Sequence, residues 1–215
     1  MAPESDLSGA DRFAGLRRQM VDQQIRRRGV DDPRILQAMT TVPRHEFVPP
    51  ELAEAAYQDR PLPIGEGQTI SQPYIVARMA DLANIEAADQ VLEIGAGCGY
   101  AAAVLGELAQ EVVTVEIRPN LAESARNTLD RLGYSNVKVV TGSVDEVDSE
   151  RRFGAVLAAA AASKIPDTLE DRLADGGRLV LPVGSRFAQH LWTVDRQGDE
   201  LVRRRHEAVA FVPLV

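Results

Sequence analysis

The stretch QVLEIGAGCGYAAAVL, residues 90–105, decides the fold of this chain. It opens with an apolar run that contains one acidic residue, Glu93. Three alternating glycines follow, Gly95, Gly97 and Gly99. Glycine accepts backbone conformations that other residues avoid, and it lets a ligand approach the main chain closely. Because an apolar, alanine-rich run comes next, we predict a buried strand, a ligand-binding turn and the start of a helix.

The pattern around this stretch alternates between strand and helix from residue 74 onward. We predict strands at residues 91–94, 112–117, 137–140, 154–162, 178–184, 190–194 and 201–212, and helices at residues 72–83, 100–108, 121–132 and just after Pro166. Alternating elements favour a parallel sheet with right-handed crossovers, and the last two strands form an antiparallel hairpin. The predicted fold class is therefore α/β, with a doubly wound, mostly parallel sheet.

The N-terminal third of the chain has a different character. Residues 1–10 are small and polar, which predicts a flexible tail. Residues 11–28 repeat apolar side chains at intervals of three and four, as a helix does, and Gly29 is a plausible stop. A second helix should begin after Asp32, with that side chain as its cap and Pro33 in its first turn.

Residues 43–73 are rich in proline and are predicted to be mostly loop, with a short helix near residues 51–56. Long loops on a rigid domain often carry function. We therefore expect a single domain over residues 11–215. Within it, residues 11–73 would form a helical and loop extension that shapes part of the site, and residues 74–215 the ligand-binding core.

Composition and charge narrow the classes of function. The chain is 45% hydrophobic and 26% charged, with a net charge of −8 and a pI of about 5.0, so nucleic acid is not an expected partner. The first ten residues do not resemble a signal peptide, no apolar run reaches the ~20 residues that span a bilayer, and Cys98 has no second cysteine to pair with. We expect a cytoplasmic protein without a membrane or an obligate protein partner.

The residues around the glycine turn favour a nucleoside ligand without phosphate. Glu116 follows the glycines by about twenty residues at the end of the next strand, where an acidic side chain accepts hydrogen bonds from ribose hydroxyls. A dinucleotide-binding turn would need a small residue at position 100, which is Tyr100 here. S-adenosylmethionine therefore fits better than a nicotinamide dinucleotide.

Five longer segments resemble one known family. They are MVDQQIRRRGVDDPRILQAMTTVPRHEFVP at 20–49, AYQDRPLPIGEGQTISQPYIVARM at 56–79, VLEIGAGCGYAAAVL at 91–105, LGYSNVKVV at 132–140 and GGRLVLPVG at 176–184. Together they closely resemble the protein-L-isoaspartate O-methyltransferase family, and GQTISQPY is the most specific of the shared motifs. The resemblance implies a seven-stranded, Rossmann-like class I methyltransferase fold, S-adenosylmethionine as methyl donor, and isoaspartyl residues of damaged proteins or peptides as acceptors.

The same resemblance assigns roles to individual residues. Ser71 would be the active-site serine. The candidate cofactor-binding residues are Thr69, Ile70, Gln72, Glu93, Gly95, Ala96, Gly97, Gly99, Tyr100, Glu116, Ile117, Gly142 and Ser143. A carboxylate acceptor is already ionised at neutral pH, so the reaction needs alignment and exclusion of water instead of a general base. Ser71 would orient the acceptor by a hydrogen bond, although a serine before a helix is also a common cap.

Two segments depart from the family pattern. Ser143 and Val144 stand where the family has an acidic residue and a glycine beside the adenine, and Gly154 replaces an aspartate. Ser143 would bind the adenine amino group more weakly, unless Asp145 takes that role. Two other functions therefore stay open: a related carboxyl methyltransferase for a dedicated peptide or small acid, and a cofactor-binding protein with little turnover. The three histidines lack metal-ligand spacing, and no metal site is expected.

Overall fold

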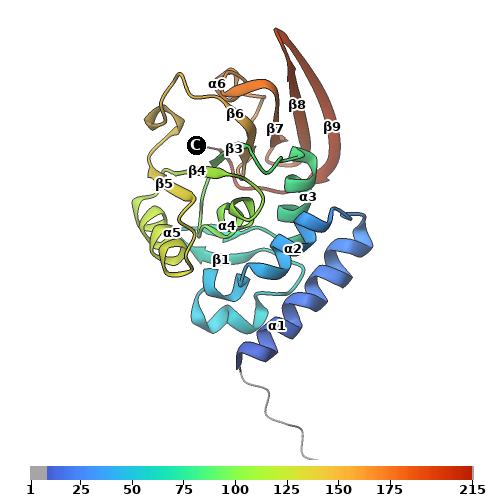
Figure 1. Cartoon of the computed structure of the whole chain (residues 1–215), viewed down its shortest axis with the longest axis vertical. Helices are drawn as coiled ribbons and strands as arrows, with labels where there is room; N and C mark the ends of the chain where they lie inside the picture. The colour runs from blue at the N-terminus through green and yellow to red at the C-terminus, as the bar shows by residue number, and fades with distance from the viewer. Residues whose placement is uncertain (1–8, 215) are drawn as a thin grey trace, which may run out of the picture.

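The computed structural model describes residues 9–214, and a seven-stranded sheet in the order β5-β4-β3-β6-β7-β8-β9 forms the centre of this part of the chain (Figure 1). The strands are β3 (Gln90–Ile94), β4 (Glu111–Glu116), β5 (Val137–Thr141), β6 (Phe153–Ala158), β7 (Leu173–Ser185), β8 (Ala188–Gln197) and β9 (Glu200–Val209). Strands β3 to β7 pair in parallel, whereas β8 and β9 are antiparallel to their neighbours. The predicted α/β sheet with an antiparallel C-terminal hairpin is confirmed.

The helices of the described chain are α1 (Gly9–Met20), α2 (Pro33–Thr41), α3 (Pro73–Ala83), α4 (Tyr100–Gly106), α5 (Pro119–Arg131) and α6 (Asp167–Glu170). Shorter helical turns are η1 (Val21–Ile25), η2 (Arg26–Arg28), η3 (Arg44–Phe47), η4 (Pro50–Ala55) and η5 (Val144–Glu146). None of these helices within residues 9–214 is both long and apolar enough to cross a membrane.

The two predicted N-terminal helices are present, with small changes. Residues 1–8 of the predicted tail lie outside the described residues, and α1 already begins at Gly9. The first helix continues to Arg28 but changes from an α-helix to a π-turn and then a 3₁₀-turn, and it ends at Gly29, whose φ of +88° suits glycine. The Asp32 carboxylate accepts a hydrogen bond from the Arg34 amide at 2.7 Å, as predicted for a cap.

The predicted loop before Ser71 contains a β-hairpin that the sequence analysis missed. Strands β1 (Leu62–Gly65) and β2 (Gln68–Ile70) pair antiparallel. Their turn is Glu66–Gly67, with φ of +49° and +70°, and a two-residue turn of this kind requires positive φ at both positions. The dipeptide was a usable signal, but the prolines around it favoured a loop. The residues just before Ser71 are therefore held in a strand.

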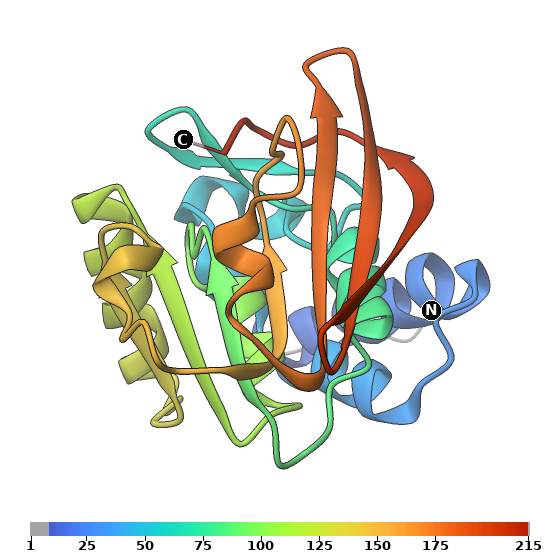
Figure 2. The same ribbon diagram turned by 90° about the horizontal axis from the view of Figure 1, so that it is seen from above.

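The central sheet has a hydrophobic core on each face, because its side chains alternate. Val91 and Val112 belong to the core beneath the N-terminal helices and α3 and α4, and Leu92 and Val113 belong to the core on the opposite face. The second face carries α6, which has four residues, together with the segment around η5. Figure 2 shows this uneven covering, with most helices gathered on one side.

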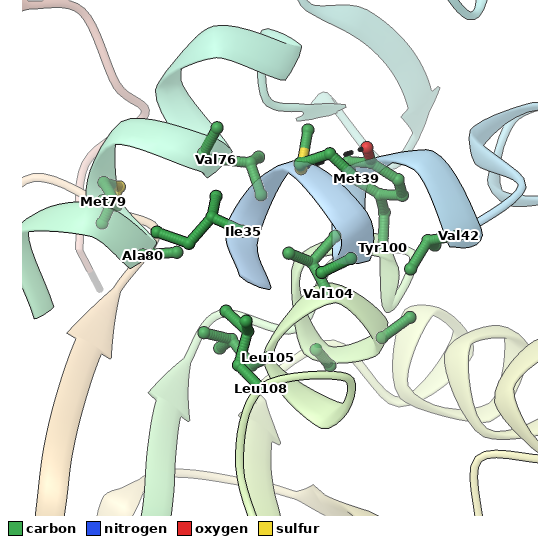
Figure 3. Packing of buried hydrophobic residues seen from close by; sticks show 14 of the residues in the cluster. Ile35, Met39, Val42, Val76, Met79, Ala80, Tyr100, Val104, Leu105 and Leu108 are labelled. Atoms are coloured by element: carbon green, nitrogen blue, oxygen red, sulfur yellow. Dashed lines mark hydrogen bonds between the residues drawn. The ribbon is translucent and has the colours of Figure 1, made fainter. Parts of the chain in front are cut away.

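Helix α2 packs the N-terminal extension onto the core. Ile35 and Met39 lie between α3 and α4 in Figure 3, close to Val76 of α3 and Val104 of α4. All four side chains are buried. The next turn along the chain, η3, contributes Phe47, whose ring meets Tyr100 edge to face at 5.7 Å. The extension is thus continuous with the core and is fixed beside the start of α4.

Candidate active site

A cavity of about 370 Å³ lies at the carboxyl ends of the central parallel strands. In open α/β sheets this edge is where ligands bind, and the volume is within the range of small-molecule sites. Its wall combines the β1–β2 hairpin, the glycine turn after β3, the ends of β4 and β5, the start of α6 and residues 212–214. Figure 2 shows the hairpin and the C-terminal segment above the same end of the sheet.

Most of the predicted site residues line this cavity. They are Thr69, Ile70, Ser71, Gly95, Ala96, Gly97, Tyr100, Glu116, Ile117, Gly142 and Ser143. Residues from four separate parts of the sequence therefore meet at one site. Gln72, Glu93 and Gly99 were predicted with them but are not part of the wall.

Glu116 holds the glycine turn in place. Its side chain, only 6% exposed, accepts a hydrogen bond from the Gly97 amide at 2.8 Å through one carboxylate oxygen and from the Arg118 amide at 3.0 Å through the other. Gly97 itself has φ of +54°, a conformation that favours glycine. Because a carboxylate oxygen can accept more than one hydrogen bond, Glu116 keeps capacity for ligand hydroxyls.

Glu93 lies behind the wall as a buried acid. It is 1% exposed, and the Thr114 hydroxyl donates a hydrogen bond to its carboxyl group at 2.5 Å. Burial raises the pKa of Glu93 to about 8, and the bond from Thr114 offsets only part of that effect. Glu93 is therefore mostly protonated at neutral pH.

Gly99 and Gln72 serve the packing of the scaffold. Gly99 has φ of +87°, and a β-carbon there would come within 3.1 Å of Leu129 and 3.3 Å of Ala125, so it permits close contact between α4 and α5. Gln72 is the N-cap residue of α3, and its side-chain amide donates to the Asp59 carbonyl at 3.2 Å. Neither residue lines the cavity.

Ser71 lies in the link between the β1–β2 hairpin and helix α3. It is half-buried between β2 and α3, and it lines the cavity. Helix α3 begins at Pro73 with Gln72 as its N-cap residue, and no side chain caps it. The alternative role of Ser71 as a helix cap is therefore wrong, and its hydroxyl is not used to start the helix.

The glycine turn, the acidic residue at the end of β4 and the serine after β2 thus share one cavity. A sequence model described as protein-L-isoaspartate(D-aspartate) O-methyltransferase matches residues 16–215. The chain belongs to this family. Its relatives include the protein-L-isoaspartate O-methyltransferases of Koribacter versatilis (strain Ellin345), 49% identical over 100% of this chain and 96% of the relative, and of Methanoculleus marisnigri, 48% identical over 93% and 91%.

Two solved structures match over most of the chain. The structure of a protein-L-isoaspartate O-methyltransferase has 26% sequence identity to this chain and a TM-score of 0.82. The match covers 92% of this chain and 66% of the other. A Plasmodium falciparum protein, crystallised with S-adenosyl-L-homocysteine, has 24% identity and a TM-score of 0.81 over 93% of this chain and 98% of its own. At this identity the second match shows the shared fold.

The departures from the methyltransferase family pattern fall in two different places. Ser143 lines the cavity, where its hydroxyl donates to the Asp145 carboxylate at 3.0 Å and accepts from the Asp145 amide at 3.2 Å. Asp145 itself does not line the cavity, and its carboxylate accepts this hydrogen bond from Ser143. Gly154 lies at the start of β6, and a β-carbon there would come within 2.3 Å of the Asp89 carboxylate. Gly154 therefore leaves room for the Asp89 carboxylate, and it does not line the cavity.

Several residues of the wall were missed by the sequence analysis. They are Pro166, Thr168 and Leu169 around α6, and Val212, Pro213 and Leu214 near the C-terminus. The sequence FVPL at residues 211–214 was the available signal for the latter group. Two backbone hydrogen bonds to Ala161 hold this segment at the site. The Ala161 amide donates to the Val212 carbonyl, and the Leu214 amide donates to the Ala161 carbonyl, both at 2.8 Å.

Cys98 and the histidines add no reactive centre. Burial raises the pKa of the Cys98 thiol to about 11, so it is protonated at neutral pH and a weak nucleophile. Across residues 9–214, no three acidic, cysteine or histidine side chains gather in a group that could hold a metal ion.

Proposed function

We propose that this chain transfers the methyl group of S-adenosylmethionine to the misplaced carboxylate of isoaspartyl residues in damaged proteins or peptides. The observation that carries the proposal is the single cavity shared by Ser71, the glycine turn and Glu116. Membership of the protein-L-isoaspartate O-methyltransferase family supports the donor and the acceptor.

The residues of the cavity fit the cofactor. The wall has room for a nucleoside, and Glu116 offers carboxylate oxygens at the end of β4 for ribose hydroxyls. Ile117, which is 49% exposed, and Val144 give an apolar surface beside it for a base. When bound, S-adenosylmethionine supplies an electrophilic methyl group on a sulfonium.

Ser71 is the proposed catalytic residue because it contacts the acceptor. The acceptor carboxylate has an ordinary pKa near 4 and is ionised at neutral pH, so no base is needed to activate it. A hydrogen bond donated by the Ser71 hydroxyl would hold one carboxylate oxygen in line for attack. The walls formed by the hairpin and residues 212–214 would exclude water, which otherwise solvates the carboxylate.

The test is transfer of labelled methyl from S-adenosylmethionine to an isoaspartyl peptide and to the matching aspartyl peptide. We expect methylation of the isoaspartyl peptide alone, and a loss of about 100-fold in Ser71→Ala, the scale seen when one positioned hydrogen-bond donor is removed. Ser135→Ala is the matched control, because Ser135 is exposed and lies outside the cavity wall.

Three results would decide against parts of the proposal. Equal methylation of both peptides would remove the isoaspartyl specificity. Full activity in Ser71→Ala would remove the catalytic role of that hydroxyl. Binding of S-adenosylhomocysteine without transfer to either peptide would favour a dedicated acceptor or a protein with little turnover.

A further inference from the structure

Arg44 is a fully buried charge that the proposed mechanism does not use. It lies in η3 and is 0% exposed. Its Nε donates a hydrogen bond to the Ala56 carbonyl at 2.6 Å, but both terminal nitrogens, Nη1 and Nη2, lack a hydrogen-bond partner within residues 9–214. A buried guanidinium with two unused nitrogens carries a large desolvation cost.

Within residues 9–214, no carboxylate lies at bonding distance from this charge. Burial lowers the pKa of Arg44 from its ordinary value, yet an arginine remains protonated in proteins. The buried acid Glu93 is itself mostly protonated, since burial raises its pKa to about 8. By contrast, Arg28 pairs with Asp59 at 3.1 Å, and Arg118 of the cavity wall lies 3.8 Å from Glu66. Arg44 is therefore positive without a counter-charge of its own.

The charge lies directly behind the cavity wall. The guanidinium carbon of Arg44 is 4.7 Å from the centre of the Tyr100 ring, and Tyr100 lines the cavity together with Cys98. Figure 3 shows Tyr100, at the start of α4, reaching toward α2, where its hydroxyl donates a hydrogen bond to the Met39 sulfur at 3.8 Å. Arg44 therefore contacts a residue of the cavity wall without lining the cavity itself.

We propose that Arg44 is a positioning residue that provides the positive charge for a carboxylate bound in the cavity, acting through the wall formed by Tyr100 and Cys98. This inference rests on the proposed function, in which two ligands carry such a group: the amino-acid part of S-adenosylmethionine and the isoaspartyl residue.

The test measures how much each variant discriminates between ligands with and without a carboxylate. The variants are Arg44→Gln, which keeps a donor for the Ala56 carbonyl, and Arg44→Lys, which keeps the charge. Their affinity is measured by calorimetry for S-adenosylhomocysteine and for its decarboxylated analogue, and the kcat and KM of isoaspartyl peptide methylation are measured in parallel. Arg28→Gln is the matched control, because Arg28 also stacks on a tyrosine, Tyr74, at 3.4 Å but has its own counter-charge.

Two results would support the proposal and would identify the ligand. In the first, Arg44→Gln loses about tenfold in affinity for S-adenosylhomocysteine while its affinity for the decarboxylated analogue is unchanged, which would assign the charge to the cofactor. This loss is the effect of a unit charge over about 10 Å at an effective dielectric constant of about 20. A similar rise in KM for the peptide, with kcat and cofactor affinity retained, would assign it to the isoaspartyl carboxylate. Arg44→Lys should restore the affected value in either case.

Other results would overturn it. Equal losses for the two cofactor ligands would show a purely structural role for Arg44, and unchanged constants would show no role. If Arg44→Gln does not fold, Arg44→Met provides a second neutral variant. If neither variant folds, Arg44→Lys decides, and a loss of discrimination in Arg44→Lys would contradict the proposal. The binding measurements do not depend on isoaspartyl turnover, so they remain informative if the proposed acceptor is wrong.

Discussion

Two acidic residues near the glycine turn differ because of their surroundings. Glu116 has backbone amides as partners for both carboxylate oxygens, whereas Glu93 has one hydroxyl partner, Thr114, and is buried. Burial disfavours the charged form of Glu93, and the hydrogen bond from Thr114 offsets only part of this effect. The sequence could not show that Glu93 is buried behind the wall, because its partner Thr114 comes from the neighbouring strand β4.

The raised pKa of Glu93 predicts a pH dependence of stability. In the unfolded chain the carboxyl group titrates near its ordinary value of 4.5, whereas in the folded chain its pKa is about 8. Below pH 4.5 both states are protonated. As the pH rises from 4.5 to 8 the unfolded state ionises first, so the folded state loses stability across this window.

Glu93→Gln should remove this loss. We expect the free energy of unfolding of Glu93→Gln, relative to the unmodified chain, to increase from pH 5 to pH 8. Urea denaturation at both pH values measures it. Glu150→Gln, an exposed substitution, should show no such trend, and a relative stability of Glu93→Gln that is independent of pH would contradict the raised pKa.

At the scale of elements, the β1–β2 hairpin closes one side of the cavity. The Glu66 carboxylate at its tip accepts a hydrogen bond from the Asn120 side chain at 2.7 Å, which connects the hairpin to the first turn of α5. Ile64 of β1 lies 3.2 Å from the position of a β-carbon on Gly97, so the hairpin also covers the glycine turn. The contact with α5 is exposed, and a contact of that kind is weak and reversible.

Asn120→Ala should speed release of the bound product. Removing one exposed contact is worth about 1 kcal/mol or less, so we expect the dissociation rate of S-adenosylhomocysteine to rise about two- to fivefold with little change in stability. Stopped-flow fluorescence can follow this release. Asn127→Ala, an exposed position on the same helix, is the control. A dissociation rate that is unchanged in Asn120→Ala would show that the hairpin does not gate release.

At the scale of the whole molecule, the far edge of the sheet helps to build the active site. Gln189 of β8 is 7% exposed and makes two hydrogen bonds to the backbone of Phe211, from its amide to the carbonyl at 3.1 Å and from the Phe211 amide to its oxygen at 2.7 Å. The residues that follow Phe211 then reach the cavity wall. The C-terminal hairpin thus anchors residues 212–214 of the cavity wall.

Gln189→Ala should therefore affect the acceptor more than the cofactor. Loss of both bonds frees residues 211–214, and we expect KM for the isoaspartyl peptide to rise about tenfold while the affinity for S-adenosylhomocysteine changes less than about threefold. Steady-state kinetics and calorimetry measure the two quantities, with Gln197→Ala at the exposed end of β8 as control. Equal losses of both would show a general destabilisation instead.

The single-domain organisation and the cytoplasmic location stay predictions at this scale. Packing of α2 against α3 and α4 agrees with a continuous domain, since one hydrophobic core includes residues of the extension and of the sheet. The predicted roles of Ser71 and of the cofactor-binding residues also remain to be tested by the experiments above.

The sequence by itself determined the features that depend on neighbours along the chain. These include the alternating strands and helices, the glycine turn after β3, the cap at Asp32 and the stop at Gly29, because side-chain period and backbone φ are local properties. The shared motif GQTISQPY also located Ser71, and the spacing from the glycines located Glu116. Eleven of the predicted residues line the cavity.

Only the tertiary structure decided the features that join distant segments. Arg44 meets Tyr100 across 56 positions of sequence, Gln189 holds Phe211 across 22, and Glu66 reaches Asn120 across 54. The burial of Arg44 and of Glu93, which raises the pKa of Glu93, is likewise a property of the packed chain. Local patterns carry no record of such contacts, because they arise when the sheet brings separate elements to a common edge.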